Sequence, residues 1–173
     1  MACGRTRQDR LARERRGGAG AGVRIPDDQI AEFRRLYADC YACGLSNPIG
    51  LHLDGFHRRS ETEIAATFDP RPEHRGTVGS LHGGVIAAAL DEICAWTAVL
   101  LADTMAVTAT LDLRFRRPGD PTGRYRLIGS LGDSSGRRLR INGVLEKDDA
   151  VVAEARGVFL ATDPVGALWP AEA

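Results

Sequence analysis

The chain has 173 residues, a formal net charge of zero at pH 7 and a hydrophobic content of 43 %. This length and composition suit one soluble globular domain with a substantial core. Balanced charge gives no argument for a nucleic-acid partner. No uninterrupted run of eighteen apolar residues occurs, so we expect no membrane partner either. The four cysteines do not form a disulfide framework, and no secretory signal is recognisable, so we expect a cytoplasmic protein.

The sequence divides into one domain between two tails. Residues 1–24 are rich in arginine and glycine, and we interpret them as a flexible tail. A more specific alternative is a nucleic-acid-binding arm, but the segment contains no aromatic residue for base stacking. Residues 25–164 form the expected folded domain, and residues 165–173 form a C-terminal tail.

The hydrophobic pattern predicts two helices and six strands. Asp27 or Asp28 can cap a first helix that runs to about Ala38, and the second helix covers about 82–101. The predicted strands cover 51–58, 61–68, 105–115, 123–131, 137–146 and 150–162. In the strand 105–115, apolar residues occupy every second position and so predict one continuous apolar face. One long helix wrapped by one curved antiparallel sheet gives an α+β fold.

The second helix begins with an unusual pair of glycines and carries an acid in its middle. His82 precedes Gly83 and Gly84, and Asp91 follows among apolar and small residues. The first amides of a helix have no intrahelical acceptor, so an uncluttered glycine start can direct N–H groups at a developing oxyanion. Asp91 is then either a half-exposed helix residue or a catalytic carboxylate. Glu92, the next residue, is expected to be a solvated or interface acid.

Three motifs resemble the hotdog-fold thioesterases, in particular the phenylacetyl-CoA thioesterase-like group. The resemblance covers roughly residues 40–163. The motifs are His82-Gly83-Gly84 with Asp91, the strand from Val107 to Pro118, and Cys43-Gly-x-x-Asn47-Pro48-x-Gly50-Leu51. The resemblance implies a hotdog fold in which about six strands wrap the central helix. It also implies hydrolysis of acyl-CoA or a related thioester without a metal or a redox cofactor.

The resemblance assigns roles to individual residues. Asp91 matches the catalytic general base or nucleophile, and Gly83 matches the residue whose amide polarises the thioester carbonyl. His82 matches a residue that shapes the site, and Thr108 falls where a Ser or Thr assists. Strand parity, however, places Thr108 on the polar face, so it reaches the site only through a bulge or a subunit interface.

Substrate binding is expected from residues around this core. Gly84 lies beside the oxyanion donor, and Arg116 and Arg117 are candidates to pair with the phosphates of CoA. Gly76 stands where some members of the family carry an Asn that positions water, and Asp112 stands where an Asn is common.

The spacing of Gly83 and Asp91 predicts an oligomer. The two residues are eight positions apart on one helix, and this corresponds to ~12 Å along its axis. One thioester carbonyl must lie ~3 Å from its oxyanion donor and also close to the attacking group. Two antiparallel helices across a two-fold axis satisfy both requirements. We therefore expect a homodimer, or a homotetramer built as a dimer of dimers.

Two other functions fit the expected fold. A hotdog hydratase or dehydratase would need a His five residues after the acid, where this chain has Trp96. A non-catalytic protein that binds acyl-CoA would have no need of Asp91.

A zinc site is the other alternative. It would combine Cys40 and Cys43 with His52 and His57, but their spacing is not that of a common zinc finger. The two histidines also fall on opposite faces of a strand. We therefore expect no metal.

Overall fold

The structure is a computed structural model, which describes residues 24–168. The predicted tail at 1–24 lies outside this range except for its last residue, and so do residues 169–173. The predicted C-terminal tail begins with a four-residue helix, α4 (Val165–Leu168). Val165 is fully buried, so the folded core extends past the expected boundary at residue 164.

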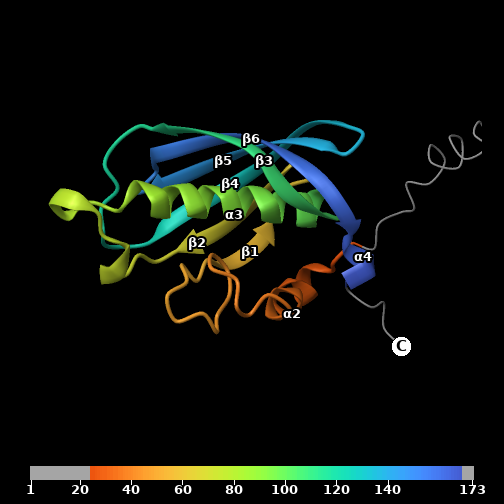
Figure 1. The fold of residues 1–173 in the computed structure, drawn as a ribbon, viewed down its shortest axis with the longest axis horizontal. Coiled ribbons are helices and arrows are strands. Elements are labelled where there is room, and N and C mark those ends of the chain that lie inside the picture. Colours follow the sequence, from red (N-terminus) through yellow and green to blue (C-terminus); the bar gives the residue numbers. More distant parts are fainter. Residues whose placement is uncertain (1–23, 169–173) are drawn as a thin grey trace, which may run out of the picture.

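Six antiparallel strands form one sheet around one long helix. The strands are β1 (Asp54–Arg58), β2 (Glu63–Phe68), β3 (Thr104–Phe115), β4 (Tyr125–Ser135), β5 (Arg138–Lys147) and β6 (Ala150–Pro164). Their order in the sheet is β1-β2-β4-β5-β6-β3, so β1 and β3 are the two edges. Figure 1 shows the helix α3 (Gly83–Leu101) running along the sheet, with β3, β5 and β6 on one side and β1 and β2 on the other. The predicted α+β architecture is confirmed.

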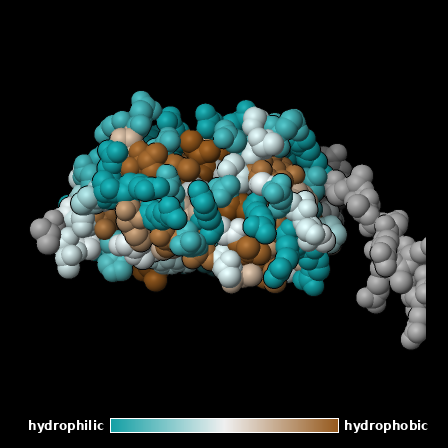
Figure 2. All heavy atoms as spheres, turned by 90° about the horizontal axis from the view of Figure 1, so that it is seen from above, coloured by the Kyte–Doolittle hydropathy of each residue, from teal (hydrophilic) through white to brown (hydrophobic). Residues whose placement is uncertain are grey.

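The core lies between α3 and the sheet. By length and composition alone α3 could cross a membrane, but most of this helix is buried within the fold. A core helix enclosed by a sheet needs this composition because apolar neighbours cover most of its circumference. Outside the core, the face seen in Figure 2 carries mostly hydrophilic side chains, with apolar patches between them.

The first helix is shorter than expected and is capped differently. A 3-10 turn, η1 (Asp27–Gln29), leads into α2 (Ile30–Arg35), which ends before the predicted Ala38. No side chain caps either element. Asp27 instead pairs with the guanidinium of Arg58, whose side chain is 6 % exposed. The predicted N-cap is therefore wrong, because a buried arginine on β1 recruits the carboxylate.

The first strand is also shorter than predicted. Leu51 and Leu53 are buried, but β1 starts only at Asp54. His52 lies between the two leucines with a φ of 57°, a left-handed conformation that interrupts an extended strand. A register shift between Asp54 and His57, with Gly55 at a φ of 66°, bends the strand further.

Strand β3 contains a bulge that changes which side chains face the helix. Thr108 pairs with Phe159 and Thr110 pairs with Val158, so Ala109 is the extra residue. The prediction of one apolar face along the whole strand is therefore wrong. Before the bulge, Val107 is 55 % exposed. After it, Leu111 and Leu113 pack against the core.

Candidate active site

Two loops hold the start of α3 in place. A 3-10 turn, η2 (Pro72–His74), precedes it, and the His74 carbonyl accepts a 3.0 Å hydrogen bond from the His82 amide. The Leu81 amide donates to the Gly119 carbonyl at 2.8 Å, so the loop between β3 and β4 supports the same point. The first turn of α3 therefore lies beside the end of β3.

His82 is the N-cap of α3. Its Nδ1 accepts a hydrogen bond of 2.9 Å from the Gly84 amide. The Gly83 amide has no acceptor among residues 24–168. Of the two glycine amides, the one at Gly83 is therefore the donor without an acceptor among the described residues. The Gly84 amide instead donates to the capping side chain of His82.

The two glycines also differ in the space around them. A Cβ at Gly83 would contact only the Phe115 ring, at 3.6 Å. A Cβ at Gly84 would lie 3.0 Å from His82 Nδ1 and would push the capping ring away. The backbone around Gly83 is consequently open on one side, whereas Gly84 is required for the close approach of His82.

Asp91 and Thr108 meet in the middle of α3. The Thr108 hydroxyl donates a 2.7 Å hydrogen bond to Asp91 Oδ1. Asp91 is half-buried and Thr108 is exposed. The bulge at Ala109 makes this contact possible, because it lets Thr108 face the helix while Leu111 beyond it also packs inward. One oxygen of the carboxylate is thus held by the hydroxyl, and its Oδ2 has no hydrogen-bond partner among the described residues.

The end of β3 forms a shallow hollow with the start of α3. Gly83, Phe115, Arg116 and Arg117 line part of it. Arg116 is engaged in an ion pair of 2.7 Å with Glu154. None of the ion pairs between described residues involves Arg117, so its guanidinium is the one available to an anionic ligand. From the sequence, Phe115 was expected only to be an apolar residue of the strand. Strand alternation does not predict that it lies beside Gly83.

The position of Gly76 excludes the side chain that some resembling proteins carry there. A Cβ at this residue would lie 3.0 Å from His82 Cα and 3.3 Å from His82 N. An Asn would need the backbone at the helix start to move. Any amide that positions water must therefore come from elsewhere.

A second polar cluster lies on the other side of α3. The Cys40 Sγ is 3.8 Å from Glu92 Oε1, and Cys43 Sγ belongs to the same group, within 4.8 Å of the others. Glu92 was expected to be a solvated or interface acid, but it is half-buried and accepts a 3.0 Å hydrogen bond from Trp96 Nε1. No sequence signal connects Glu92 with cysteines about fifty residues earlier.

The proposed histidine partners of the cysteines lie elsewhere. His52 Nε2 is 2.6 Å from the Asn47 carbonyl, and His57 Nδ1 is 2.8 Å from the Gly55 carbonyl. The set of two cysteines and two histidines considered from the sequence therefore does not come together in the fold.

Burial and hydrogen bonding shift the ionisation of the second cluster. Burial raises the pKa of the Glu92 carboxyl to about 7. A hydrogen bond from the Cys43 thiol, aided by backbone amides, lowers the pKa of the Cys40 thiol to about 5. The same thiol contact, followed by burial, raises the pKa of Cys43. Of the two thiols, Cys40 therefore has the lower pKa.

Comparisons with known proteins assign the fold to a class. Residues 78–156 match the family described as the Thioesterase superfamily. A crystal structure of a thioesterase superfamily protein aligns with a TM-score of 0.66 at 20 % identity, covering 92 % of this chain and 86 % of that one. The resemblance to the hotdog-fold thioesterase superfamily and the hotdog fold are thereby confirmed.

More particular relatives are also found. The chain is 28 % identical to acyl-coenzyme A thioesterase THEM4 of Bos taurus over 80 % of this chain, and it spans 58 % of the length of that protein. The crystal structure of smu.793 from Streptococcus mutans UA159, bound to acetyl CoA, aligns with a TM-score of 0.60 at 16 % identity. That alignment covers 65 % of this chain and 90 % of that chain.

Proposed function

We propose that this protein hydrolyses acyl-CoA thioesters. The observation that carries the proposal is the pairing of a held carboxylate, Asp91 with Thr108 at 2.7 Å, with an amide at Gly83 that has no acceptor among the described residues. The relative from Bos taurus is named an acyl-CoA thioesterase, and the Streptococcus mutans structure holds acetyl CoA. Both names support the same substrate class.

Each residue then has a distinct part in the chemistry. The Thr108 hydroxyl occupies Asp91 Oδ1, so Oδ2 can accept a proton from water or attack the carbonyl itself. The Gly83 amide stabilises the negative charge that develops on the thioester oxygen. As the new C–O bond forms, the C–S bond breaks and the CoA sulfur leaves as a thiolate, which takes up the proton that Asp91 removed from water. If Asp91 attacks directly, water then hydrolyses the resulting acyl-enzyme anhydride and releases the acid. Arg117, which lines the hollow beside Gly83, would pair with a phosphate of CoA.

We further propose that the site forms between two copies of the chain. Gly83 and Asp91 lie on the same helix, so their ~12 Å separation along its axis prevents one subunit from supplying both groups to one carbonyl. Strand β3 is an edge of the sheet, and Val107 and Phe115 on it are 55 % and 53 % exposed. Unpaired edges of this length invite pairing with another chain. A two-fold pairing along β3 would set Gly83 of one copy against Asp91 of the other.

The test replaces Asp91 by Asn, which keeps the size of the side chain and removes the charge. General-base catalysis contributes ~10²–10⁴-fold, so kcat for thiol release should fall at least about a hundredfold with KM nearly unchanged. Asp112→Asn is the matched control, because Asp112 is an exposed acid on the same β3 whose side chain makes no hydrogen bond to another described residue. Light scattering of both variants should show a dimer or tetramer.

Two results would refute the proposal. Near-normal kcat in Asp91→Asn on a panel of short, long and aromatic acyl-CoAs would make Asp91 structural and favour a non-catalytic acyl-CoA-binding protein. A fully active monomer would remove the shared site.

A further inference from the structure

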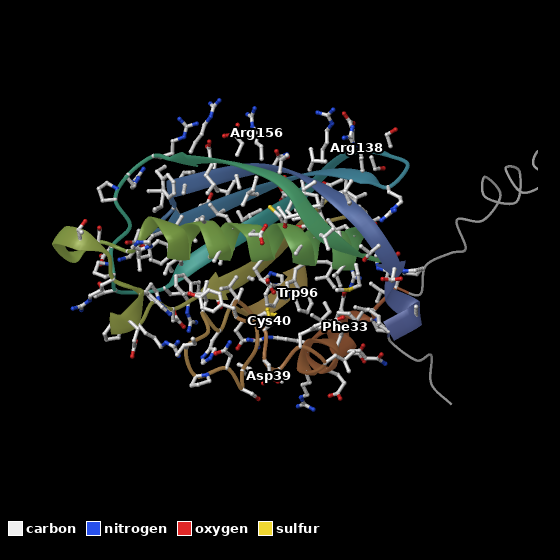
Figure 3. The ribbon with its side chains drawn as sticks, viewed as in Figure 1. Phe33, Asp39, Cys40, Trp96, Arg138 and Arg156 are labelled. Atoms are coloured by element: carbon white, nitrogen blue, oxygen red, sulfur yellow. The ribbon has the colours of Figure 1, made fainter. Side chains whose placement is uncertain are left out.

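The segment before β1 makes a tight turn beside Glu92 of α3. Cys40 and Cys43 belong to this turn, and Glu92 reaches it from the helix. The ligand atoms of the three residues all lie within 4.8 Å of one another. Trp96 of α3 contacts the same Glu92 as Cys40 does, and both residues are labelled in Figure 3. We propose that Cys40, Cys43 and Glu92 bind a Zn²⁺ ion.

The distances suit a tetrahedral ion. Zinc binds thiolates at about 2.3 Å and carboxylate oxygens at about 2.0–2.2 Å, which places tetrahedral ligand atoms about 3.5–3.8 Å apart. Cys40 Sγ lies 3.8 Å and 3.9 Å from the two oxygens of Glu92. The Cys40 and Glu92 ligand atoms therefore need to move together by only a few tenths of an ångström, and the Cys43 sulfur, within 4.8 Å of both, can approach them by side-chain rotation. Three protein ligands leave the fourth position to water.

The backbone of the turn is fixed before any ion binds. The Gly44 amide donates to the Cys40 carbonyl at 3.0 Å, and the buried Arg34 donates from Nε to the Cys43 carbonyl at 2.8 Å. A Cβ at Gly44 would lie 2.3 Å from the Ala38 carbonyl oxygen, so only glycine fits.

The carboxylate is held as firmly as the turn. Trp96 donates its indole N–H to Glu92 Oε1 at 3.0 Å. The Trp96 ring is 4 % exposed and stacks on Phe56 with the ring centroids 4.3 Å apart. A hydrogen bond of this kind is what orients a ligand from outside the coordination sphere. The ring therefore fixes the direction of Glu92 toward the cysteines.

The charge balance of the cluster favours a cation. None of the ion pairs found within residues 24–168 involves Glu92, although its carboxylate is half-buried. Burying a carboxylate beside a thiolate is costly unless a positive charge compensates for it. A divalent ion supplies this charge, and the thiol protons leave to solvent as it binds. Two sulfur ligands with one oxygen ligand suit zinc better than magnesium or calcium.

The experiment uses the full-length, untagged chain, kept reduced and freed of metal. Co²⁺ is the spectroscopic probe, because cobalt bound by thiolates gives a charge-transfer band. Zn²⁺ affinity is then measured by competition with a chromophoric chelator. We expect one ion per chain. Cys43→Ser should weaken Zn²⁺ binding at least about a hundredfold. Glu92→Gln, which keeps an oxygen acceptor for Trp96, should weaken it at least about tenfold.

The control is Cys94→Ala, which removes a buried thiol from the same helix, outside the cluster. It should leave Zn²⁺ affinity unchanged within about twofold. The proposal is overturned if the reduced protein shows no cobalt–thiolate band, if Cys43→Ser binds Zn²⁺ like the parent, or if Cys40 and Cys43 form a disulfide despite the reductant. No readout depends on thioester hydrolysis, so this result and the proposed activity stand or fall separately.

Discussion

Replacement of Thr108 by Val tests the contact between β3 and α3 directly. Valine has nearly the shape of threonine and suits a strand, so the bulge at Ala109 should remain. The change removes only the hydroxyl that donates a 2.7 Å hydrogen bond to Asp91 Oδ1. A hydrogen bond to a charged group contributes about 1.5–3 kcal/mol. Thr108 is exposed and Asp91 is half-buried, so water can replace the donor in part, and the lower end of this range applies.

About 1.5 kcal/mol corresponds to a roughly tenfold loss of kcat, if the hydroxyl holds Asp91 in its reactive orientation. KM should change little, because the hydroxyl contacts the carboxylate rather than the CoA moiety. The assay follows free thiol release from an acyl-CoA substrate under saturating and sub-saturating conditions. Circular dichroism on the same samples should show a folded protein with a thermal midpoint only a few degrees lower, because the same hydrogen bond contributes to stability.

Two further variants make the result specific. Thr110→Val changes the same side chain on the same strand, beyond the bulge and without a bond to Asp91, so its kcat should match the parent. Thr108→Ser retains a hydroxyl and should recover most of the activity. Equal losses in Thr108→Val and Thr110→Val, or no recovery in Thr108→Ser, would show that Thr108 does not act through Asp91.

Two other predictions concern stability. Gly44→Ala places a Cβ 2.3 Å from the Ala38 carbonyl oxygen, so the free energy of unfolding should fall by more than about 2 kcal/mol; an unchanged thermal midpoint would contradict this. Burial, followed by the charge of Arg71, lowers the pKa of His74 below 6.5. The folded state then stays neutral where the unfolded chain takes up a proton, so stability should be full above pH 6.5 and fall as the pH drops toward the folded pKa. Urea unfolding at about pH 7.5 and 5.5 should show this loss of stability. The free energy of unfolding of His74→Asn should fall less between the two pH values. An equal fall in both proteins would exclude His74 as the cause.

The architecture was predictable because it depends on periodicity. Alternation located the last four strands within a few residues, and the apolar run after Gly83 located the central helix. These signals are local in sequence. The pairing of Asp91 with Thr108 was only partly predictable, because uninterrupted alternation through Ala109 conceals the bulge that turns Thr108 inward.

The errors come from contacts between distant residues. The local sequence predicts that Asp27 caps a helix, but Asp27 instead forms an ion pair with Arg58, thirty-one positions later. Glu92 reads as a solvated acid because nothing in its neighbourhood predicts a loop folded over it. Cys40 covers it from a position 52 residues earlier in the chain. Tertiary packing decides whether a side chain contacts a neighbour in sequence or a distant residue. A local sequence pattern carries no information about that packing.

The order of the strands affects how the chain folds during synthesis on the ribosome. Strand β3 has β6 as its neighbour, and Thr108 is paired with Phe159. The nascent chain therefore carries β3 without a partner while about fifty further residues are added, which takes several seconds at ~5–20 residues per second. The bulge that aims Thr108 at Asp91 acquires its register only when the last strand has been synthesised. The contact between Thr108 and Asp91 is thus among the last parts of the protein to be assembled, and a chain truncated before β6 would present α3 to chaperones and proteases without this contact.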